Sequence, residues 1–590
     1  MPEPSQMATP LLLPRPRWMQ IMPGRALLHH GAPVAERDDK PRFDGEEAYS
    51  LRADESGVSI AARSAAGFRH ARHTLQQLRT QYGQWCPSLV VEDAPTFPTR
   101  GVMLDVSRDR VPTMAQLFET IGVLAALKFN HLELYTEHTF AYAGHEEAWQ
   151  GWSPITPAEA RELDAYARRH GIELSANQNC FGHLSKWLSL PRYAQLAETH
   201  GAWLFENAHE QFHRTGPFSL CPVDPASAAF IDDLLSQMLP CFKSGLVNIG
   251  CDETFDIGFG RSADAVKARG RAAVYFEFVN RICVSARRLG KRPMFWADIA
   301  LSHPESASAI PEDMVCLAWD YEPTARFAEW CRVLRSVQRE VWVCPGTSSW
   351  RSITGRTTER RGNLRAAARD GAAGGSTGFL VTDWGDCGHH QQWPISLAGI
   401  AEAADAAWSG NSGQGYDPRA ASLHAFGDET LEAAPWLDEL GDVDLPLRRI
   451  GGRRGEGESS SVLRNSTVLF NDLFTPIGPG GDEKLRRGTL SVPQQLLEEA
   501  LERLEELASR RPRGVTELVA RELDHSLAVA RTALRRAIWR RSPSEAQRRS
   551  IADSLRGIIE EHRTLWLKRC RGGGLDDSCS HYQKTLEELA

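Results

Sequence analysis

The sequence lacks the features that mark membrane-spanning proteins and general nucleic-acid binders. No stretch approaches the 18 or so consecutive apolar residues that a transmembrane helix needs. Basic side chains are not in excess, because 68 Lys and Arg stand against 76 Asp and Glu, for a net charge of −8. Binding to nucleic acid or to an anionic membrane surface draws on a basic surplus. We therefore expect neither partner, and a small neutral substrate instead.

Metal-binding patterns are also missing. The 12 cysteines contain no Cys-x-x-Cys pair and no Cys/His cluster at zinc spacing, and no His-x-His or His-Glu-x-x-His motif occurs. Several cysteines lie inside apolar runs, where a cysteine is usually a small buried hydrophobe. We expect no metal, no cofactor and no disulfide framework.

The N-terminal residues show no secretory signal. A signal peptide has a basic start followed by an apolar stretch of about 7–15 residues, and this chain has only a short Leu run between prolines. Taken as written, the sequence predicts a soluble cytoplasmic protein. It leaves the oligomeric state open, a homo-oligomer included.

Three regions are distinguished by their patterns. Residues 1–97 combine short strand-like pieces with one helical stretch and predict a small α+β domain, which ends at the Pro-rich junction Asp93–Arg100. Residues 98–425 alternate short apolar runs with longer amphipathic segments such as Met114–Leu127 and Pro157–His170. Residues 426–590 carry several amphipathic stripes and predict a helical region whose helices pack on each other and on the preceding domain.

The middle region has the pattern of a parallel closed barrel. Eight buried strands alternating with helices over about 250–300 residues are typical of the (β/α)8 fold, so the chain is classed as α/β. The eight apolar runs are Gly101–Val106, His131–Tyr135, Ile172–Ala176, Leu246–Gly250, Pro293–Ala297, Met314–Trp319, Glu340–Cys344 and Gly378–Thr382.

Polar or aromatic residues follow nearly every one of these runs. In such barrels the active site lies at the carboxyl ends of the strands, so these residues are expected to meet there. They are Ser107-Arg108-Asp109, Glu137-His138, Asn177-Gln-Asn179, Asp252-Glu253, Trp296-Ala-Asp298, Asp320-Tyr321-Glu322, Thr347-Ser-Ser-Trp350 and Asp383-Trp-Gly-Asp386. The 17 tryptophans favour a carbohydrate site slightly, because sugar rings stack on flat aromatic surfaces.

The pair Asp252-Glu253 is the strongest chemical signal. It follows the fourth apolar run directly, within Val247-Asn-Ile-Gly-Cys-Asp-Glu-Thr254. Two neighbouring carboxylates repel in a closed site, so their pKa values separate and one can keep a proton near neutral pH. That separation supplies one general acid and one anionic group. An isolated Asp-Glu pair would be read as a solvated loop or a helix cap, and its place among the ordered strand ends argues for function.

This segment resembles the Gly-x-Asp-Glu signature of glycoside hydrolase family 20, the β-N-acetylhexosaminidases. The likeness extends to Asp93–Arg108, which is similar to the entry of that family into its first barrel strand. The preceding Thr74-Leu-Gln-Gln-Leu78 is similar to the end of the family's small N-terminal domain, and Arg571–Ser578 to a feature near the C-terminus of some relatives.

The resemblance implies a retaining exo-glycosidase that removes terminal β-linked N-acetylhexosamine, GlcNAc or GalNAc. It implies substrate-assisted chemistry, in which the 2-acetamido oxygen attacks C1 and forms an oxazolinium ion. Glu253 would protonate the leaving oxygen and later deprotonate water. Asp252 would stay ionised and orient the acetamide N–H.

The resemblance also assigns substrate-binding roles. Arg100 would bind sugar hydroxyls, His183 would support the acid/base, and Tyr321 would donate to the acetamide oxygen. Trp296, Trp319 and Trp384 would enclose the acetamide methyl, and Asp386 would bind hydroxyls. The strand-end residues that complete the expected set are Glu137, His138, Asn179 and Trp350.

The chain departs from the family pattern at several strand ends. Gly250-Cys251 replaces the usual Gly-Gly, and the second and third ends read Thr136-Glu-His-Thr-Phe140 and Asn177–His183. These changes concern the substrate pocket and leave the choice between GlcNAc and GalNAc open. Two alternatives stay open as well: a barrel glycosidase in which two carboxylates such as Glu137 and Glu253 include a direct nucleophile, and a carbohydrate-binding protein without catalysis.

Overall fold

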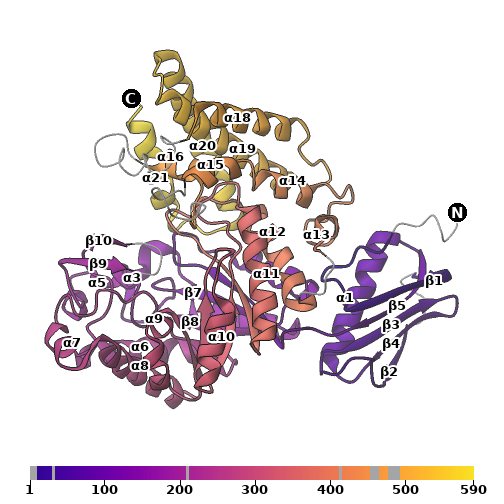
Figure 1. The fold of residues 1–590 in the computed structure, drawn as a ribbon, viewed down its shortest axis with the longest axis horizontal. Coiled ribbons are helices and arrows are strands. Elements are labelled where there is room, and N and C mark those ends of the chain that lie inside the picture. The colour runs from indigo at the N-terminus through magenta and orange to yellow at the C-terminus, as the bar shows by residue number, and fades with distance from the viewer. Residues whose placement is uncertain are drawn as a thin grey trace.

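A computed structural model of the chain shows a small sheet domain, a barrel and a helical region in that order (Figure 1). It describes residues 9–28, 34–206, 211–410, 415–451, 464–475 and 492–589. Within these ranges every helix is too short or too polar to span a bilayer. All twelve cysteines are free thiols, and eleven of them are buried.

The N-terminal domain is a five-stranded sheet with one helix against it. The strands lie in the order β1-β5-β3-β4-β2, and α1 packs on β3, β4 and β5. The Ser64 side chain caps α1 by accepting from the Gly67 amide at 3.1 Å. The elements are β1 (Trp18–Leu27), β2 (Val34–Asp38), β3 (Tyr49–Asp54), β4 (Gly57–Ala62), α1 (Ala65–Tyr82) and β5 (Trp85–Asp93).

The barrel closes through eight parallel strands in the order β11-β12-β13-β14-β15-β6-β7-β8, which confirms the predicted fold class. Each predicted apolar run overlaps one of them. The strands are β6 (Thr99–Asp105), β7 (His131–Thr136), β8 (Glu173–Gln178), β11 (Leu246–Asn248), β12 (Arg292–Trp296), β13 (Val315–Trp319), β14 (Glu340–Cys344) and β15 (Gly378–Asp383). The fourth, β11, ends two residues earlier than expected, because the backbone turns at Gly250.

Amphipathic helices surround the barrel. Thr156 and Glu159 form a capping box at the start of α4, and Pro157 occupies its first turn. The long helices are α2 (Met114–Ala126), α4 (Pro157–Arg169), α6 (Pro225–Met238), α8 (Arg271–Arg288), α10 (Phe327–Ser336), α11 (Thr357–Ala373) and α12 (Trp393–Ser409). Shorter ones are α3 (Glu146–Trp149), α5 (Ser185–Leu188), α7 (Ala263–Arg269) and α9 (Asp298–Ser302), with 3-10 turns at Gln150–Trp152, Ala194–Leu196, Leu239–Cys241 and Pro304–Ala309.

A hairpin extends the loop after β8. Its strands are β9 (Ala202–Glu206) and β10 (Gln211–Thr215), which pair antiparallel. The sequence patterns did not predict it, because its short strands lie outside the alternation of barrel strands and helices. It brings aromatic side chains to the carboxyl-end rim of the barrel.

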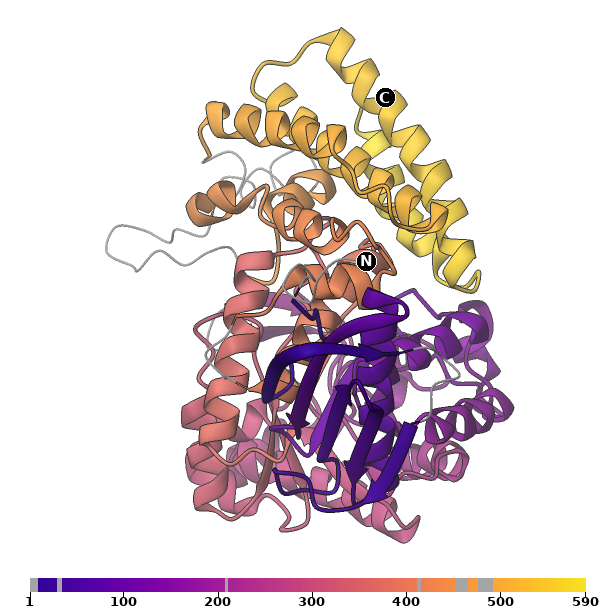
Figure 2. The same cartoon turned by 90° about the vertical axis from the view of Figure 1, so that its right-hand side faces the viewer.

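The C-terminal region is helical and lies on one side of the barrel in both ribbon views (Figure 1 and Figure 2). Leu497, Ala500, Leu504 and Leu507 form one of its amphipathic stripes and are buried. The helices are α13 (Pro418–Ala425), α14 (Ala433–Leu440), α15 (Leu445–Gly451), α16 (Val468–Phe474), α18 (Gln494–Ser509), α19 (Glu517–Trp539), α20 (Glu545–Arg569) and α21 (Leu575–Glu587).

This region docks on loops at the carboxyl-end rim. The Thr113 amide, in the loop after β6, donates to the Arg569 carbonyl at 2.9 Å. The His390 ring, in the loop after β15, lies 3.0 Å from the Ser578 carbonyl oxygen. In the loop after β14, the Arg351 carbonyl accepts from the Thr467 amide at 3.1 Å. The helical region therefore packs against three rim loops of the barrel.

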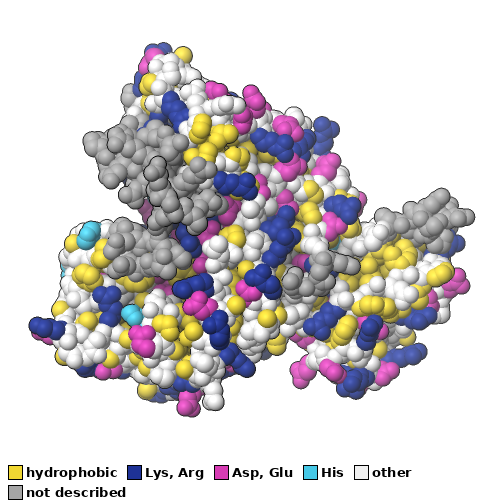
Figure 3. Space-filling model, viewed as in Figure 1, with side chains coloured by type: hydrophobic (Ala, Val, Ile, Leu, Met, Phe, Trp, Pro, Cys, Tyr) yellow, Lys and Arg dark blue, Asp and Glu magenta, His cyan; other side chains and the backbone are white. Residues whose placement is uncertain are grey.

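The molecular surface carries both signs of charge side by side. Lys and Arg alternate with Asp and Glu over the face in Figure 3, without a continuous basic area. This mixture agrees with the net charge of −8.

Candidate active site

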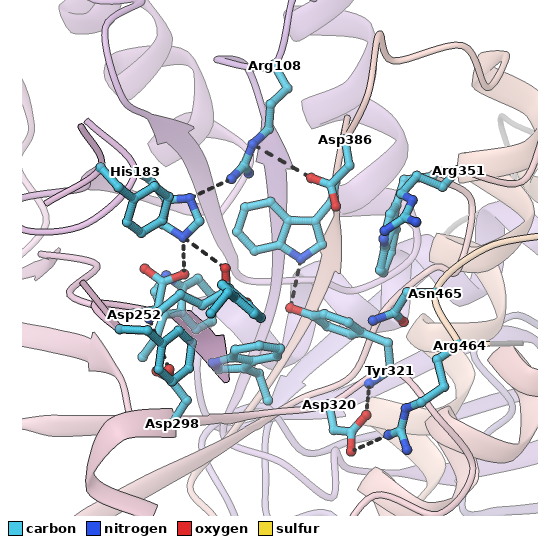
Figure 4. Close-up of a pocket in the computed structure, with 18 of the residues that line it drawn as sticks. Arg108, His183, Asp252, Asp298, Asp320, Tyr321, Arg351, Asp386, Arg464 and Asn465 are labelled. Atoms are coloured by element: carbon cyan, nitrogen blue, oxygen red, sulfur yellow. Dashed lines mark hydrogen bonds and ion pairs between the residues drawn. The ribbon is translucent and has the colours of Figure 1, made fainter. Parts of the chain in front are cut away.

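A cavity of about 740 Å³ opens at the carboxyl ends of the barrel strands. Every strand end contributes to its wall, as expected for a barrel active site. One side chain from each end is, in order from β6 to β15, Arg108, Glu137, His183, Glu253, Trp296, Tyr321, Trp350 and Asp386. Figure 4 shows His183, Asp252 and Asp298 on one side of the cavity and Tyr321, Arg351 and Asn465 on the other.

An unusual backbone turn presents the two adjacent acids to the same cavity. Neighbouring side chains of a strand normally point to opposite faces. Here Gly250, Cys251 and Glu253 have φ angles of 68°, 73° and 53°, which turn the chain away from strand geometry. A Cβ on Gly250 would lie 2.4 Å from Asn179 Oδ1, so only glycine fits there. Left-handed non-glycine residues cost about 1–3 kcal/mol each and cluster at functional sites.

Asp252 is held as an anion. Its Oδ1 accepts from the Asn179 amide at 3.0 Å, and its Oδ2 lies 3.1 Å from His183 Nε2. Burial alone would raise the pKa of Asp252, but the charge and hydrogen bond of His183 and the Asn179 amide outweigh it and lower that pKa. In return, Asp252 overcomes the effect of burial on His183 and raises the imidazole pKa to about 9.

Glu253 has the opposite shift. Burial and the repulsion of Asp252 and Asp386 raise its pKa to about 7, against the opposing charges of His183 and Arg108. The Glu253 amide donates to Asp298 Oδ2 at 3.0 Å, which fixes the turn. The two carboxyls thus differ as the sequence predicted: at neutral pH Asp252 is ionised, while a large fraction of Glu253 is protonated.

Arg108 organises the neighbouring edge of the cavity, where its Nη2 lies 3.2 Å from His183 Nδ1. Its guanidinium lies between two aromatic rings, 4.8 Å from the centroid of Tyr135 and 4.9 Å from that of Trp384. It is 3.3 Å from Glu137 Oε1 and 3.7 Å from Asp386 Oδ1. A planar fork of donors next to two carboxylates suits a pair of adjacent sugar hydroxyls, which can both accept and donate.

Aromatic side chains form the floor and one wall. The Trp384 indole N–H donates to the Tyr321 hydroxyl at 2.8 Å. Trp319 stacks on Tyr321 with ring centroids 5.4 Å apart, and Trp350 meets the same ring edge-on at 4.9 Å. Trp296 lies 6.0 Å from Trp384, centroid to centroid. Three predicted tryptophans and Tyr321 thus share one enclosure.

The prediction for Arg100 was wrong. Arg100 is the second residue of β6, at the opposite end of the strand from the cavity, and its side chain is only 1% exposed. Its guanidinium binds Glu47 of the N-terminal domain at 2.7 Å and the carbonyls of Phe97 and Lys128. It joins the two domains and cannot reach a sugar. The rim arginine is Arg108, which follows the same strand.

Two other predicted binding residues lie behind the cavity wall. His138 does not line the cavity; its ring packs edge-on against Trp152 at 4.8 Å, and burial lowers its pKa to about 3. Asn179 also lies outside the wall, where it holds Asp252 through the amide described above. The other ten predicted residues, apart from Arg100, all line the cavity, the catalytic pair included.

Several wall residues were missed by the sequence reasoning. Arg108 was among the polar residues that follow the first apolar run. Because it lies beyond the carboxyl end of β6, it could have been predicted as the cavity arginine in place of Arg100, which lies near the start of that strand. Phe205 and Arg214 come from the unpredicted hairpin. Arg464 and Asn465 come from the C-terminal region, and no local pattern connects them with the barrel. Among the described residues no group of three or more His, Cys, Asp or Glu is arranged to hold a metal ion.

Family models match two stretches of the chain. The model described as "Glycosyl hydrolase family 20, catalytic domain" matches residues 97–332, and the one described as "Glycosyl hydrolase family 20, domain 2" matches residues 25–94. Together they cover just over half of the 590 residues. The last two barrel strands, β14 and β15, and the helical region lie outside both matches.

Proteins of similar sequence are named beta-hexosaminidases. The chain is 27% identical over 328 residues to the beta-hexosaminidase of Vibrio furnissii, covering 48% of this chain and 50% of the relative. It is 26% identical over 258 residues to the beta-hexosaminidase subunit alpha of Mus musculus, covering 41% and 46%. The chain therefore spans about half the length of the curated relatives it matches.

Solved structures show the same fold. The Flavobacterium johnsoniae chitobiase aligns with a TM-score of 0.56 at 16% identity, over 98% of this chain and 99% of that one. The Vibrio harveyi exo beta-N-acetylglucosaminidase in complex with N-acetylglucosamine aligns with a TM-score of 0.54 at 18% identity, over 73% and 77%.

Proposed function

Because the chain belongs to glycosyl hydrolase family 20, we propose that it removes terminal β-linked N-acetylhexosamine with retention of configuration. One observation carries the proposal. Adjacent Asp252 and Glu253 face one cavity, and their environments move their pKa values in opposite directions. A pair with this split provides a proton donor and a fixed negative charge within reach of one bond.

The first step breaks the glycosidic bond. Glu253 donates its proton to the leaving oxygen while the substrate's 2-acetamido oxygen forms a bond to C1. Asp252 accepts the acetamide N–H and stabilises the positive charge of the oxazolinium ion. The Tyr321 hydroxyl, which already accepts from Trp384 at 2.8 Å, donates its proton to the acetamide oxygen and orients it. The tryptophan enclosure around it suits the acetamide methyl.

The second step restores both the sugar and the enzyme. Glu253, now ionised, takes a proton from water, and the hydroxide adds to C1 from the face that the aglycone left. The C1–oxygen bond of the oxazolinium opens and returns the acetamide. Two inversions at C1 give net retention, and Glu253 ends protonated as it began.

A direct enzyme nucleophile is less well supported. Such an attack needs an ionised carboxylate free to approach C1. Glu137 accepts from the Tyr135 hydroxyl at 2.9 Å, and burial raises its pKa despite the nearby Arg108. Asp252, the ionised acid, is engaged by Asn179 and His183.

A paired screen tests the proposal directly. Aryl β-glycosides of GlcNAc, GalNAc and glucose are compared, with NMR following the first anomer released. Hydrolysis of either N-acetylhexosaminide with retention, none of the glucoside, and inhibition by a thiazoline mimic of the oxazolinium are expected. A covalent adduct trapped by a fluorosugar would establish a direct nucleophile. Absence of all hydrolysis would favour a carbohydrate-binding protein.

The rate is expected to fall on the alkaline side. The active form needs Glu253 protonated and Asp252 ionised. Above the pKa of about 7, Glu253 loses its proton, so kcat/KM should fall tenfold per pH unit. On the acid side the rate should hold until Asp252 is protonated, below its ordinary pKa of 3.8. Initial rates with an aryl substrate from pH 4 to pH 10 give the profile, and a rate that rises through pH 7 would contradict the assignment.

Two arginines on β6 and its following loop are expected to behave differently. Arg108→Met removes donors from the cavity and should lower kcat/KM about a hundredfold. Arg100→Met breaks a buried ion pair between domains and should cost about 3 kcal/mol of stability without a specific change in KM. Thermal melts and kinetics on both variants measure this. A raised KM with normal stability for Arg100→Met would restore the original assignment.

A further inference from the structure

A second cavity lies in the C-terminal helical region, apart from the catalytic one. Its volume is about 570 Å³, which is within the usual range for small-molecule sites, and it shares no wall residue with the cavity at the barrel rim. Its wall comes entirely from α18, α19 and α20, of which α19 packs against the other two. Figure 1 shows these helices above the barrel. We call this space the helical cavity.

The bottom of the helical cavity contains a buried imidazole. His525 of α19 is 3% exposed, and in the part of the chain that the structure describes neither of its ring nitrogens has a hydrogen-bond partner. Burial lowers the pKa of His525 to about 4, so at neutral pH the uncharged ring has one N–H donor and one acceptor nitrogen. Buried polar groups without partners are costly. A ligand group that both donates and accepts would satisfy this ring.

The charged groups on the wall are already paired with one another. The pairs are Arg521 with Glu561 at 2.9 Å, Arg531 with Glu505 at 2.6 Å, Arg535 with the same Glu505 at 3.7 Å, and Asp524 with Arg511 at 2.8 Å. A small ion would have to separate one of these pairs or lie next to a like charge. A neutral molecule rich in hydroxyl groups can bond to both partners of a pair, because a hydroxyl donates one hydrogen bond and accepts two.

The wall between these pairs is apolar and open. Ala528 lies along α19 between Arg521 and Arg531, and Ile558 faces the same cavity from α20. Gly557 leaves α20 without a side chain at this point, and an added Cβ there would have no atom within 4 Å. A sugar ring has C–H groups on its faces and hydroxyls around its rim. An apolar strip flanked by donors and acceptors therefore suits a sugar.

We propose that the helical cavity binds a neutral mono- or disaccharide. The paired arginines and carboxylates bond to the hydroxyl rim, and Ala528, Gly557 and Ile558 cover a face of the ring. A hydroxyl directed to the bottom of the cavity bonds to His525. This inference goes beyond the proposed function, because no residue of the helical cavity takes part in the reaction at the barrel rim.

Sugars of different charge test the class of ligand. Glucose, N-acetylglucosamine and cellobiose are the neutral probes, and glucosamine and glucuronate are a cation and an anion at pH 6. In NMR titrations of the full-length chain, at least one neutral probe should bind the wild type about tenfold more tightly than it binds Gly557→Met, because the long side chain fills the helical cavity. A larger difference for either charged probe would overturn the neutral class.

The matched control is Gly122→Met. Gly122 also lies inside a helix, α2, with no atom within 4 Å of an added Cβ, and it lines neither cavity. Methionine favours helix more than glycine does, so both variants should fold. The control should bind every probe as the wild type does. Equal binding of every neutral probe by the wild type and Gly557→Met would overturn the site.

His525→Leu separates ligand binding from folding. Leucine removes the two unpartnered ring nitrogens, so the melting temperature should stay the same or rise, while affinity for the neutral probe should fall about fivefold or more. A lower melting temperature with unchanged affinity would show that His525 supports only the fold and would overturn its role in the site.

The comparison also keeps the two sites apart. Sugar bound at the barrel rim contributes equally to the wild type and to Gly557→Met, so only the helical cavity produces a difference. If hexosaminides are hydrolysed and no difference is found, the helical cavity fails and the proposed function stands. If the difference is found and no hexosaminide is hydrolysed, the proposed function fails and the saccharide site stands.

Discussion

Glu253→Gln is expected to lower kcat/KM by about a thousandfold for substrates with poor leaving groups. Glutamine has nearly the same shape as a protonated glutamic acid but cannot transfer a proton. A methyl or sugar leaving group needs that proton as its bond to C1 breaks, whereas a dinitrophenolate leaves without it. The loss should therefore be much smaller for a dinitrophenyl glycoside in the first step. Kinetics across a series of leaving groups measure the difference.

The same variant should change the pH profile. If the fall in rate above pH 7 is caused by loss of the Glu253 proton, whose pKa is about 7, then the residual rate of Glu253→Gln should not fall through this pH. Glu305→Gln serves as the control, since Glu305 is 74% exposed and outside the cavity. Near-normal turnover of a sugar substrate by Glu253→Gln, with the alkaline limb intact, would exclude Glu253 as the proton donor.

The barrel could be predicted from sequence because its strands are buried on both faces. Continuous apolar runs such as Gly378–Thr382 are conspicuous when the chain alternates them with amphipathic helices. The β9–β10 hairpin gave no such signal, because its two five-residue strands pair only with each other. The end of β11 also escaped prediction, since positive φ angles at Cys251 and Glu253 are set by tertiary contacts.

The sequence predicted the site residues that directly follow barrel strands. It did not predict which arginine near β6 faces the cavity, or which residues of the C-terminal helical region reach it. Arg100 is the second residue of β6 and Arg108 follows the end of that strand, so residues 101–107 separate a domain interface from the cavity. The family resemblance pointed to Arg100, whereas the position of each arginine relative to the carboxyl end of β6 identifies Arg108 as the one at the cavity. Arg464 and Asn465 reach the cavity only through contacts such as Asn465 with Glu322. No sequence period encodes a contact of this kind.

Asp252→Asn is expected to reduce activity severely, as Glu253→Gln does. An asparagine keeps the shape of Asp252 but removes the charge that would stabilise the oxazolinium, so kcat should fall about a hundredfold to a thousandfold. Asp252 also keeps His183 charged, and that charge lowers the pKa of Glu253 by more than Asp252 raises it, so the fall in rate on the alkaline side should move to higher pH in the variant. Both effects follow from one change, and a merely structural role would produce neither shift.

Inhibitor affinities and a control substitution at a neighbouring aspartate test the role of the Asp252 charge further. A thiazoline mimic of the oxazolinium should lose affinity for Asp252→Asn far more than the product sugar does, because the charge acts on the cationic intermediate. Asp298→Asn is the comparison, since burial and the repulsion of Asp252 raise the pKa of the neighbouring Asp298 well above its usual range. Its effect on kcat should be much smaller. Equal losses in the two variants, with no movement of the alkaline limb, would show that Asp252 supports the fold of the turn and that the oxazolinium is stabilised elsewhere.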